Sequence, residues 1–181
     1  MSDAAPAEIV SFWRQAGPDK WFAADEDFDR TIRSRFLAVH EAATRGELAA
    51  FEDSAVGALA LLILLDQFPR NMFRHSARAF ATDHAARAIA DRALARGFDQ
   101  ETEATMRPFF YLPFMHSELL ADQDRSLRLY QAFGEPGQLK FAETHRDIIV
   151  KFRRFPHRNR ALGRETTPAE RRFLDDGGFS G

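Results

Sequence analysis

Two segments of the chain place an arginine and an asparagine just after a Phe-Pro pair. The first reads Phe-Pro-Arg-Asn at positions 68–71, and the second reads Phe-Pro-His-Arg-Asn at positions 155–159. Arginine presents a planar fork of N–H donors that matches the oxygens of a carboxylate or a phosphate. The repeated pattern therefore predicts that Arg70 and Arg158 converge on a small anion.

The neighbouring side chains complete this predicted anion site. Asn71 and Asn159 would orient the anion, and phenylalanine rings would form the walls of the cleft. The predicted ligand-binding residues are Arg70, Asn71, Arg158, Asn159, His157, Phe68, Phe114 and Phe155. A purely structural interpretation is also open. Arg70 and Arg158 could bond the partly negative carbonyls at helix ends, and Asp66 stands four residues before Arg70, a spacing that allows a helical ion pair.

A third segment, at positions 111–118, carries groups that could transfer a proton. It ends in His116, Ser117 and Glu118. Histidine changes its charge near neutral pH and a nearby carboxylate tunes it, so His116 with Glu118 is the predicted catalytic pair. Alternatively, Ser117 caps a helix that carries Glu118 in its first turn. The sequence leaves open whether the chain is an enzyme.

His145 lies on the apolar face of a predicted helix, beside Ile149 and Phe152. A histidine in such a place is usually a core residue that one hydrogen bond satisfies. The alternative is that His145 forms the wall of a pocket and faces His116.

Several other chemistries lack their usual sequence pattern. No two histidines stand three or four residues apart, so zinc-protease and helical di-metal signatures are absent. A metal site built from the distant His116, His145 and His157 is an alternative, but we predict no metal and no cofactor. Glycine-rich phosphate loops and the GxSxG elbow are missing. The absence of cysteine excludes disulfides and thiol catalysis.

The charge balance argues against a dedicated nucleic-acid binder, which normally has a basic excess. The net charge is −2 and the pI is about 6.3. Positions 151–164 are rich in Lys and Arg without any acidic residue. A solvated surface with helix-end pairing explains this segment better than nucleic-acid binding does.

The length and composition indicate one soluble domain that covers residues 1–181. Phenylalanine is abundant, with 18 residues, and most of these rings should lie in the core. The longest apolar run, 55–65, is roughly half the ~20 residues that span a bilayer, so it predicts a buried helix and no membrane contact. No signal-peptide pattern begins the chain, and the expected location is the cytoplasm.

Apolar periodicity predicts an all-α fold of about eight helices, and no segment alternates as a β-strand does. Ser54 should cap a central helix that is apolar all round and that Pro69 ends. Thr82 or Asp83 should cap another helix, and positions 167–170 read as a capping box. The expected helices span 6–15, 25–45, 56–65, 83–96, 101–110, 117–133, 138–152 and a last one from 168.

The chain resembles an uncharacterised bacterial family, domain of unknown function 924. The segments that carry the resemblance are 64–71, 79–83, 111–118, and 154–159 with 162–164, in a match that extends from 9 to 179. The resemblance implies antiparallel helical hairpins stacked in a tetratricopeptide-repeat-like right-handed superhelix with a concave surface. It implies no activity, because none is established for the family. One departure is His75, where the family pattern has glycine, and this puts the geometry of that loop in doubt.

The leading hypothesis from the sequence is a protein that binds a small anionic metabolite in a cleft formed by the three segments. The competing hypothesis is a non-enzymatic helical-repeat scaffold whose concave surface binds a partner protein or peptide. The oligomeric state and the identity of the ligand do not follow from the sequence.

Overall fold

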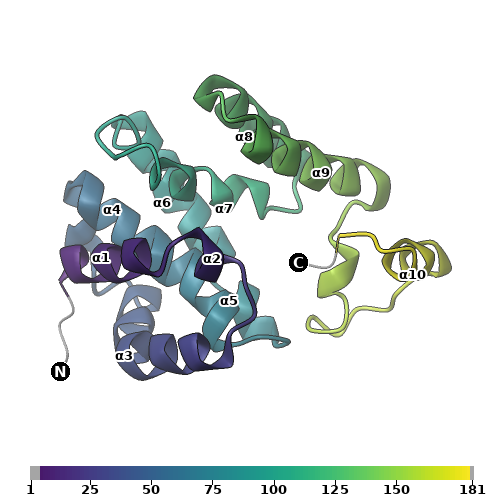
Figure 1. The fold of residues 1–181 in the computed structure, drawn as a ribbon, viewed down its shortest axis with the longest axis horizontal. Helices are drawn as coiled ribbons and strands as arrows, with labels where there is room; N and C mark the ends of the chain where they lie inside the picture. Colours follow the sequence, from purple (N-terminus) through teal and green to yellow (C-terminus); the bar gives the residue numbers. More distant parts are fainter. Residues whose placement is uncertain (1–4, 180–181) are drawn as a thin grey trace. The chain divides into compact units, whose positions relative to one another are not determined.

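The computed structural model describes residues 5–179 and confirms the all-α fold class (Figure 1). No β-strand occurs in these residues. The α-helices are α1 (Pro6–Ala16), α2 (Pro18–Trp21), α3 (Glu26–Thr44), α4 (Ala55–Leu62), α5 (Phe68–Met72), α6 (Asp83–Ala95), α7 (Leu112–Met115), α8 (Leu120–Phe133), α9 (Pro136–Phe152) and α10 (Pro168–Asp175). The 3₁₀ segments are η1 (Ala49–Asp53), η3 (Ala77–Phe80), η4 (Arg107–Phe110) and η5 (Pro156–Arg158), and η2 (Ile63–Gln67) is a π-helix.

The chain divides into two compact units. The first unit contains the described residues up to Arg74 together with Arg78–Pro113. The second unit contains His75–Ala77 and the described residues from Phe114 onward. The single domain over 1–181 and the tetratricopeptide-repeat-like superhelix therefore stay predictions.

Aromatic rings form the centre of the first unit. Phe68 is fully buried, and its ring centroid lies 4.9 Å from that of Phe36 and 5.6 Å from that of Trp13. Burying one such side chain stabilises the folded state by about 1.5–3 kcal/mol. Phe68 thus occupies a core position, which favours a packing role over that of a cleft wall.

Pro69 does not end the central helix, which corrects the prediction from the sequence. After α4 the chain passes through η2 and continues directly into α5, where Pro69 lies in the first turn. The amide of Phe68 donates to the carbonyl of Ile63, five residues back, as in a π-helix. Proline is tolerated here because an amide in the first turn of a helical segment needs no partner within that segment.

A side chain of α3 and one just before α6 bond two carbonyls of this π-helix. His40 Nδ1 lies 2.8 Å from the carbonyl oxygen of Leu64, and Thr82 Oγ1 donates to the carbonyl of Leu65 at 2.5 Å. Thr82 precedes α6, but its side chain makes no capping bond, contrary to the prediction for that helix start. The reason is tertiary, because the hydroxyl already bonds a carbonyl 17 residues away.

Burial makes His40 a pH-sensitive part of the first unit. Burial is the main cause that lowers the pKa of His40, and the charge of Arg78 acts in the same direction. The hydrogen bond to Leu64 and the charge of Glu41 oppose this pKa shift without reversing it. Below pH ~6.5 the unfolded chain therefore binds more protons at this residue than the folded chain does.

We expect the free energy of unfolding of the wild-type chain to fall as the pH drops below about 6.5. Above that value His40 is neutral in both states and causes no loss of stability. Thermal unfolding followed from about pH 7.5 to about pH 5.5 measures this slope. A His40→Gln variant should have a smaller slope over the same window. An identical slope in both chains would mean that His40 does not couple protonation to folding.

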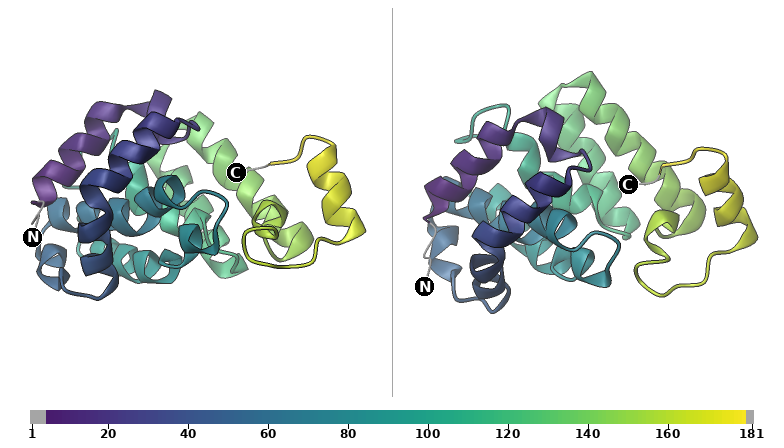
Figure 2. Two further views of the ribbon diagram at one scale, coloured as in Figure 1. Left: turned by 90° about the horizontal axis from the view of Figure 1, so that it is seen from below. Right: turned by 60° about the horizontal axis from the view of Figure 1, so that its bottom comes forward.

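Helices α8 and α9 form an adjacent pair in the second unit (Figure 2). Gly134, with φ +83°, ends α8 in the left-handed conformation that glycine adopts without strain. α10 begins with the predicted capping box, which the structure confirms. Thr167 Oγ1 accepts from the Glu170 amide at 3.3 Å, and Glu170 Oε2 accepts from the Thr167 amide at 2.8 Å.

The structure corrects the predicted start of α8 and bears on the expected glycine at position 75. α8 begins at Leu120, so Glu118 precedes the helix rather than lying in its first turn. Ser117 Oγ accepts from the Leu119 amide and donates to Asp122 at 2.6 Å, which forms a turn before α8 instead of an N-cap. His75 has φ +62°, the left-handed region where glycine is favoured, in line with the glycine that the resemblance led us to expect.

Candidate functional site

Arg70 in α5 is surrounded by acidic groups of the first unit. Its guanidinium donates to both carboxylate oxygens of Asp83, at 2.9 and 3.2 Å, and to the carbonyl of Asp66 at 2.5 Å. The predicted ion pair with the Asp66 carboxylate is also present, at 3.4 Å. Asp66 is only 1% exposed. An external anion at Arg70 would have to compete with these two carboxylates.

Asn71 is likewise bound within the first unit. Its Nδ2 donates to Asp29 at 2.7 Å, and Asp29 also pairs with Arg74. Asn71 is nearly buried, at 5% exposure. The Phe-Pro-Arg-Asn segment therefore connects α5 to α3 and α6 through buried polar contacts.

The third and second sequence segments meet inside the second unit. Glu118 Oε1 accepts from the Phe155 amide at 2.8 Å, across 37 positions of sequence. Arg164 donates to both oxygens of Glu118, at 2.8 and 3.0 Å, and to the carbonyl of Phe155 at 3.1 Å. Arg164 thus connects the predicted His-Ser-Glu and Phe-Pro-His-Arg-Asn segments.

The same network continues to α10 through Asn159. Arg164 Nε donates to Asn159 Oδ1 at 3.0 Å, and Asn159 Nδ2 donates to Glu170 Oε2 at 3.3 Å. Arg154 then pairs with both oxygens of Glu170, at 2.6 and 2.8 Å. Asn159 and Glu170 are 0% and 2% exposed, so these contacts are shielded from solvent.

The network lowers the pKa of both carboxyl groups. Burial by itself would raise the pKa of Glu118, but hydrogen bonds from Arg164 and the Phe155 amide outweigh it, and the net shift is downward. The hydrogen bond from Arg154 lowers the pKa of Glu170 to about 2 against the opposing effect of burial, with help from Thr167. Both groups are therefore ionised at neutral pH, and Glu118 is a poor proton donor there.

Two histidine rings, those of His145 and His157, pack on Phe155 and Phe179, and a third, that of His116, lies beside His145. The His145 centroid is 6.5 Å from that of His116, 5.5 Å from that of Phe155 and 4.5 Å from that of Phe179. The His157 ring packs on the same two phenylalanines, at 5.6 and 5.3 Å. His145 is buried and its Nδ1 lies 2.8 Å from the Phe141 carbonyl oxygen, as expected for a core histidine, while its ring also faces His116.

Arg158 completes this histidine cluster, which we define as His116, His145, His157 and Arg158. The guanidinium carbon of Arg158 lies 4.6 Å from the centre of the Phe155 ring, and the side chain is 6% exposed. Its positive charge also contributes to the lowered pKa of Glu118. Among residues 5–179 no group of three His, Asp or Glu side chains is arranged to hold a metal ion.

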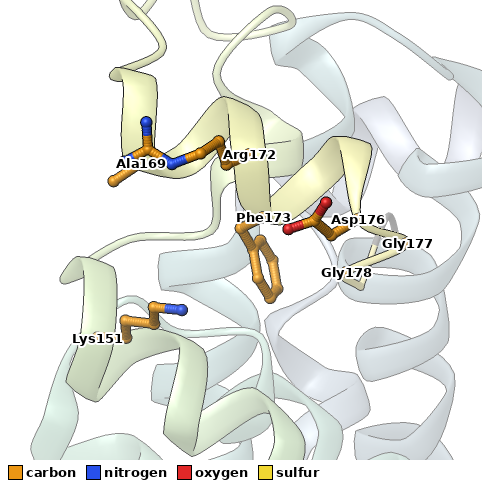
Figure 3. Close-up of a pocket in the computed structure, with 7 residues that line it drawn as sticks. All are labelled: Lys151, Ala169, Arg172, Phe173, Asp176, Gly177 and Gly178. Atoms are coloured by element: carbon orange, nitrogen blue, oxygen red, sulfur yellow. The ribbon is translucent and has the colours of Figure 1, made fainter.

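A surface pocket of about 470 Å³ lies between α9 and α10 in the second unit. Figure 3 shows Lys151 extending from α9 toward the ring of Phe173 on α10, with the carboxylate of Asp176 directed to the same space. The full lining is Lys151, Ala169, Arg172, Phe173, Asp176, Gly177 and Gly178. An adjoining pocket of about 340 Å³ shares Lys151, Phe173 and Gly178.

Comparison with known proteins places the chain in a family. The model of a family described as bacterial protein of unknown function (DUF924) matches residues 9–178. The chain belongs to the DUF924 family. A solved structure of a protein of unknown function from Agrobacterium tumefaciens is 52% identical, with a TM-score of 0.92 over 95% of this chain and 97% of that one. A comparison with curated proteins found no match.

For this DUF924 protein the sequence singled out some functional candidates and missed others. His157 and Arg158 pack on the Phe155 ring, and His116 lies beside His145, which packs on that same ring. Arg164 and Glu170 carry the polar network but were not predicted as site residues, and only the capping box gave a signal for Glu170.

No helix in the described part of the chain is both long and apolar enough to cross a membrane.

Proposed function

We propose that the second unit binds a small anionic molecule where the 114–118 segment meets the 155–159 segment. The observation that supports this most is the position of Arg158 on the Phe155 ring, on which the imidazole rings of His145 and His157 also pack. Guanidinium and imidazole groups donate charge-assisted hydrogen bonds to anions, which are about twice as strong as neutral ones. The Phe155 ring holds the guanidinium in a fixed orientation.

The proposed roles follow from how each side chain is held. Arg158 would bind the anion, and His116 and His157, which are only partly buried, would contact it from the solvent side. Glu118 and Asn159 would support the loop through Arg164, because their polar groups bond that side chain. His116 is the proposed proton-transfer group, since its ring is the one that faces His145.

Equilibrium dialysis of the full chain against inorganic phosphate, pyrophosphate, succinate and citrate tests this proposal. We expect saturable binding of at least one of these anions, weakened about tenfold or more by Arg158→Gln or His116→Gln. Arg160→Gln is the matched control, because Arg160 is an exposed arginine two residues away. The affinity of the Arg160→Gln chain for the anion should equal that of the wild type.

Circular dichroism of each variant separates lost binding from lost folding. Folded Arg158→Gln and His116→Gln chains that still bind with wild-type affinity would refute the anion site. Equal weakening in Arg160→Gln would refute it as well, because the binding would then reflect only the general positive charge of this segment.

A further inference from the structure

We propose that the pocket between α9 and α10 is a second ligand site, which binds an α-amino acid with an apolar side chain. The pocket lies wholly within the second unit and shares no residue with the histidine cluster. Its lining combines two cations, one carboxylate and an aromatic ring. A volume of about 470 Å³ is within the range of small-molecule sites.

The two cations suit the carboxylate of such a ligand. Lys151 comes from α9 and Arg172 from α10, so they approach the pocket from different helices (Figure 3). The Lys151 ammonium lies over the Phe152 and Phe173 rings, 5.0 and 5.6 Å from their centres. Within residues 5–179 neither cation forms an ion pair with a carboxylate, so both charges are available to a ligand.

The opposite end of the pocket suits an ammonium group. Asp176 follows the last turn of α10, where the helix dipole already carries a partial negative charge. A carboxylate in that place is unfavourable by itself, and a positive ligand group beside it relieves the repulsion. The pocket therefore presents positive and negative ends, as a zwitterion requires.

An apolar surface for the ligand's side chain lies between and beside these charges. Phe173 lines both this pocket and the adjoining one of about 340 Å³, where Ile148, Phe152 and Phe179 add further apolar area. The Phe173 ring is held by the close approach of Gly178, because a Cβ at that position would collide with the carbonyl and the ring of Phe173. Gly178 also donates its amide to the Phe173 carbonyl at 2.9 Å.

The test is a titration of the ¹⁵N-labelled full chain with L-phenylalanine, followed through the amide signals of Gly177 and Gly178. We expect saturable shifts of both signals. 3-Phenylpropionate lacks the ammonium and 2-phenylethylamine lacks the carboxylate, and each should bind about tenfold more weakly or worse. Equal affinity of either analogue would overturn the assignment to an amino acid, and the absence of saturable shifts would overturn the site.

Matched substitutions show which side chains hold the ligand. Lys151→Gln, Arg172→Gln and Asp176→Asn should each weaken L-phenylalanine binding about tenfold. The controls Lys140→Gln, Arg171→Gln and Asp175→Asn change the same residue types outside the pocket and should leave the affinity unchanged. Equal losses in the controls would refute the site. Arg158→Gln should leave it intact, so failure of the anion site and failure of this one are distinguishable.

Discussion

Replacing Arg70 by alanine is expected to destabilise the first unit by about 3–5 kcal/mol. Arg70 is the shared partner of Asp66 and Asp83, which are 1% and 9% exposed. Without the guanidinium, two buried carboxylates would lose their arginine and repel each other. Because about 1 kcal/mol moves the midpoint of a chain this size by roughly 2–4 °C, thermal unfolding should show a drop of at least about 6 °C.

Arg45→Ala is the matched control for this prediction. Arg45 pairs with Glu47, but both side chains are more than half exposed. Such surface pairs contribute at most about 1 kcal/mol, so the midpoint should change little. An unchanged or raised midpoint in Arg70→Ala would instead identify Arg70 as a functional charge that costs stability.

Replacing Glu170 by alanine is expected to destabilise the second unit by about 3 kcal/mol or more. The carboxylate accepts hydrogen bonds from Nε and Nη2 of Arg154 and from Nδ2 of Asn159. It also accepts from the Thr167 amide, which completes the capping box. Its loss leaves Arg154 without its carboxylate partner and Asn159 with one bond fewer. Thermal unfolding near neutral pH, monitored by circular dichroism, measures the effect.

The pH dependence gives a second readout for Glu170. Its pKa is lowered to about 2 in the folded chain, below its ordinary value of 4.5. The stabilisation is therefore complete above pH ~4.5 and is lost as the pH falls from there toward 2. The difference in stability between wild type and Glu170→Ala should shrink over that window.

Glu165→Ala is the control for this second prediction. Glu165 is exposed and contributes its backbone carbonyl to Arg154, at 2.8 Å, which the substitution retains. The thermal unfolding midpoint of Glu165→Ala should stay close to that of the wild type. A loss in Glu165→Ala equal to that in Glu170→Ala would contradict the role of the buried carboxylate network.

Local sequence signals predicted much of the helical structure correctly. Ser54 caps α4 by accepting from the Gly57 amide at 3.2 Å, and Thr167 and Glu170 form the expected capping box. These predictions are correct because the donor and the acceptor of each cap are only three residues apart, so a short stretch of sequence contains both partners. The failures at Pro69 and Thr82 involve carbonyls that distant side chains bond, which no local pattern records.

The sequence by itself determined the helical class, the family and the residue types that could carry chemistry. Only the tertiary structure decided which of those residues lie together. Glu118 meets Phe155 and Arg164 across 37 and 46 positions, and Lys151 meets Arg172 and Asp176 at a pocket between two helices. The physical reason is that helix formation depends on hydrogen bonds between near neighbours, whereas a site depends on long-range packing that brings separate helices together.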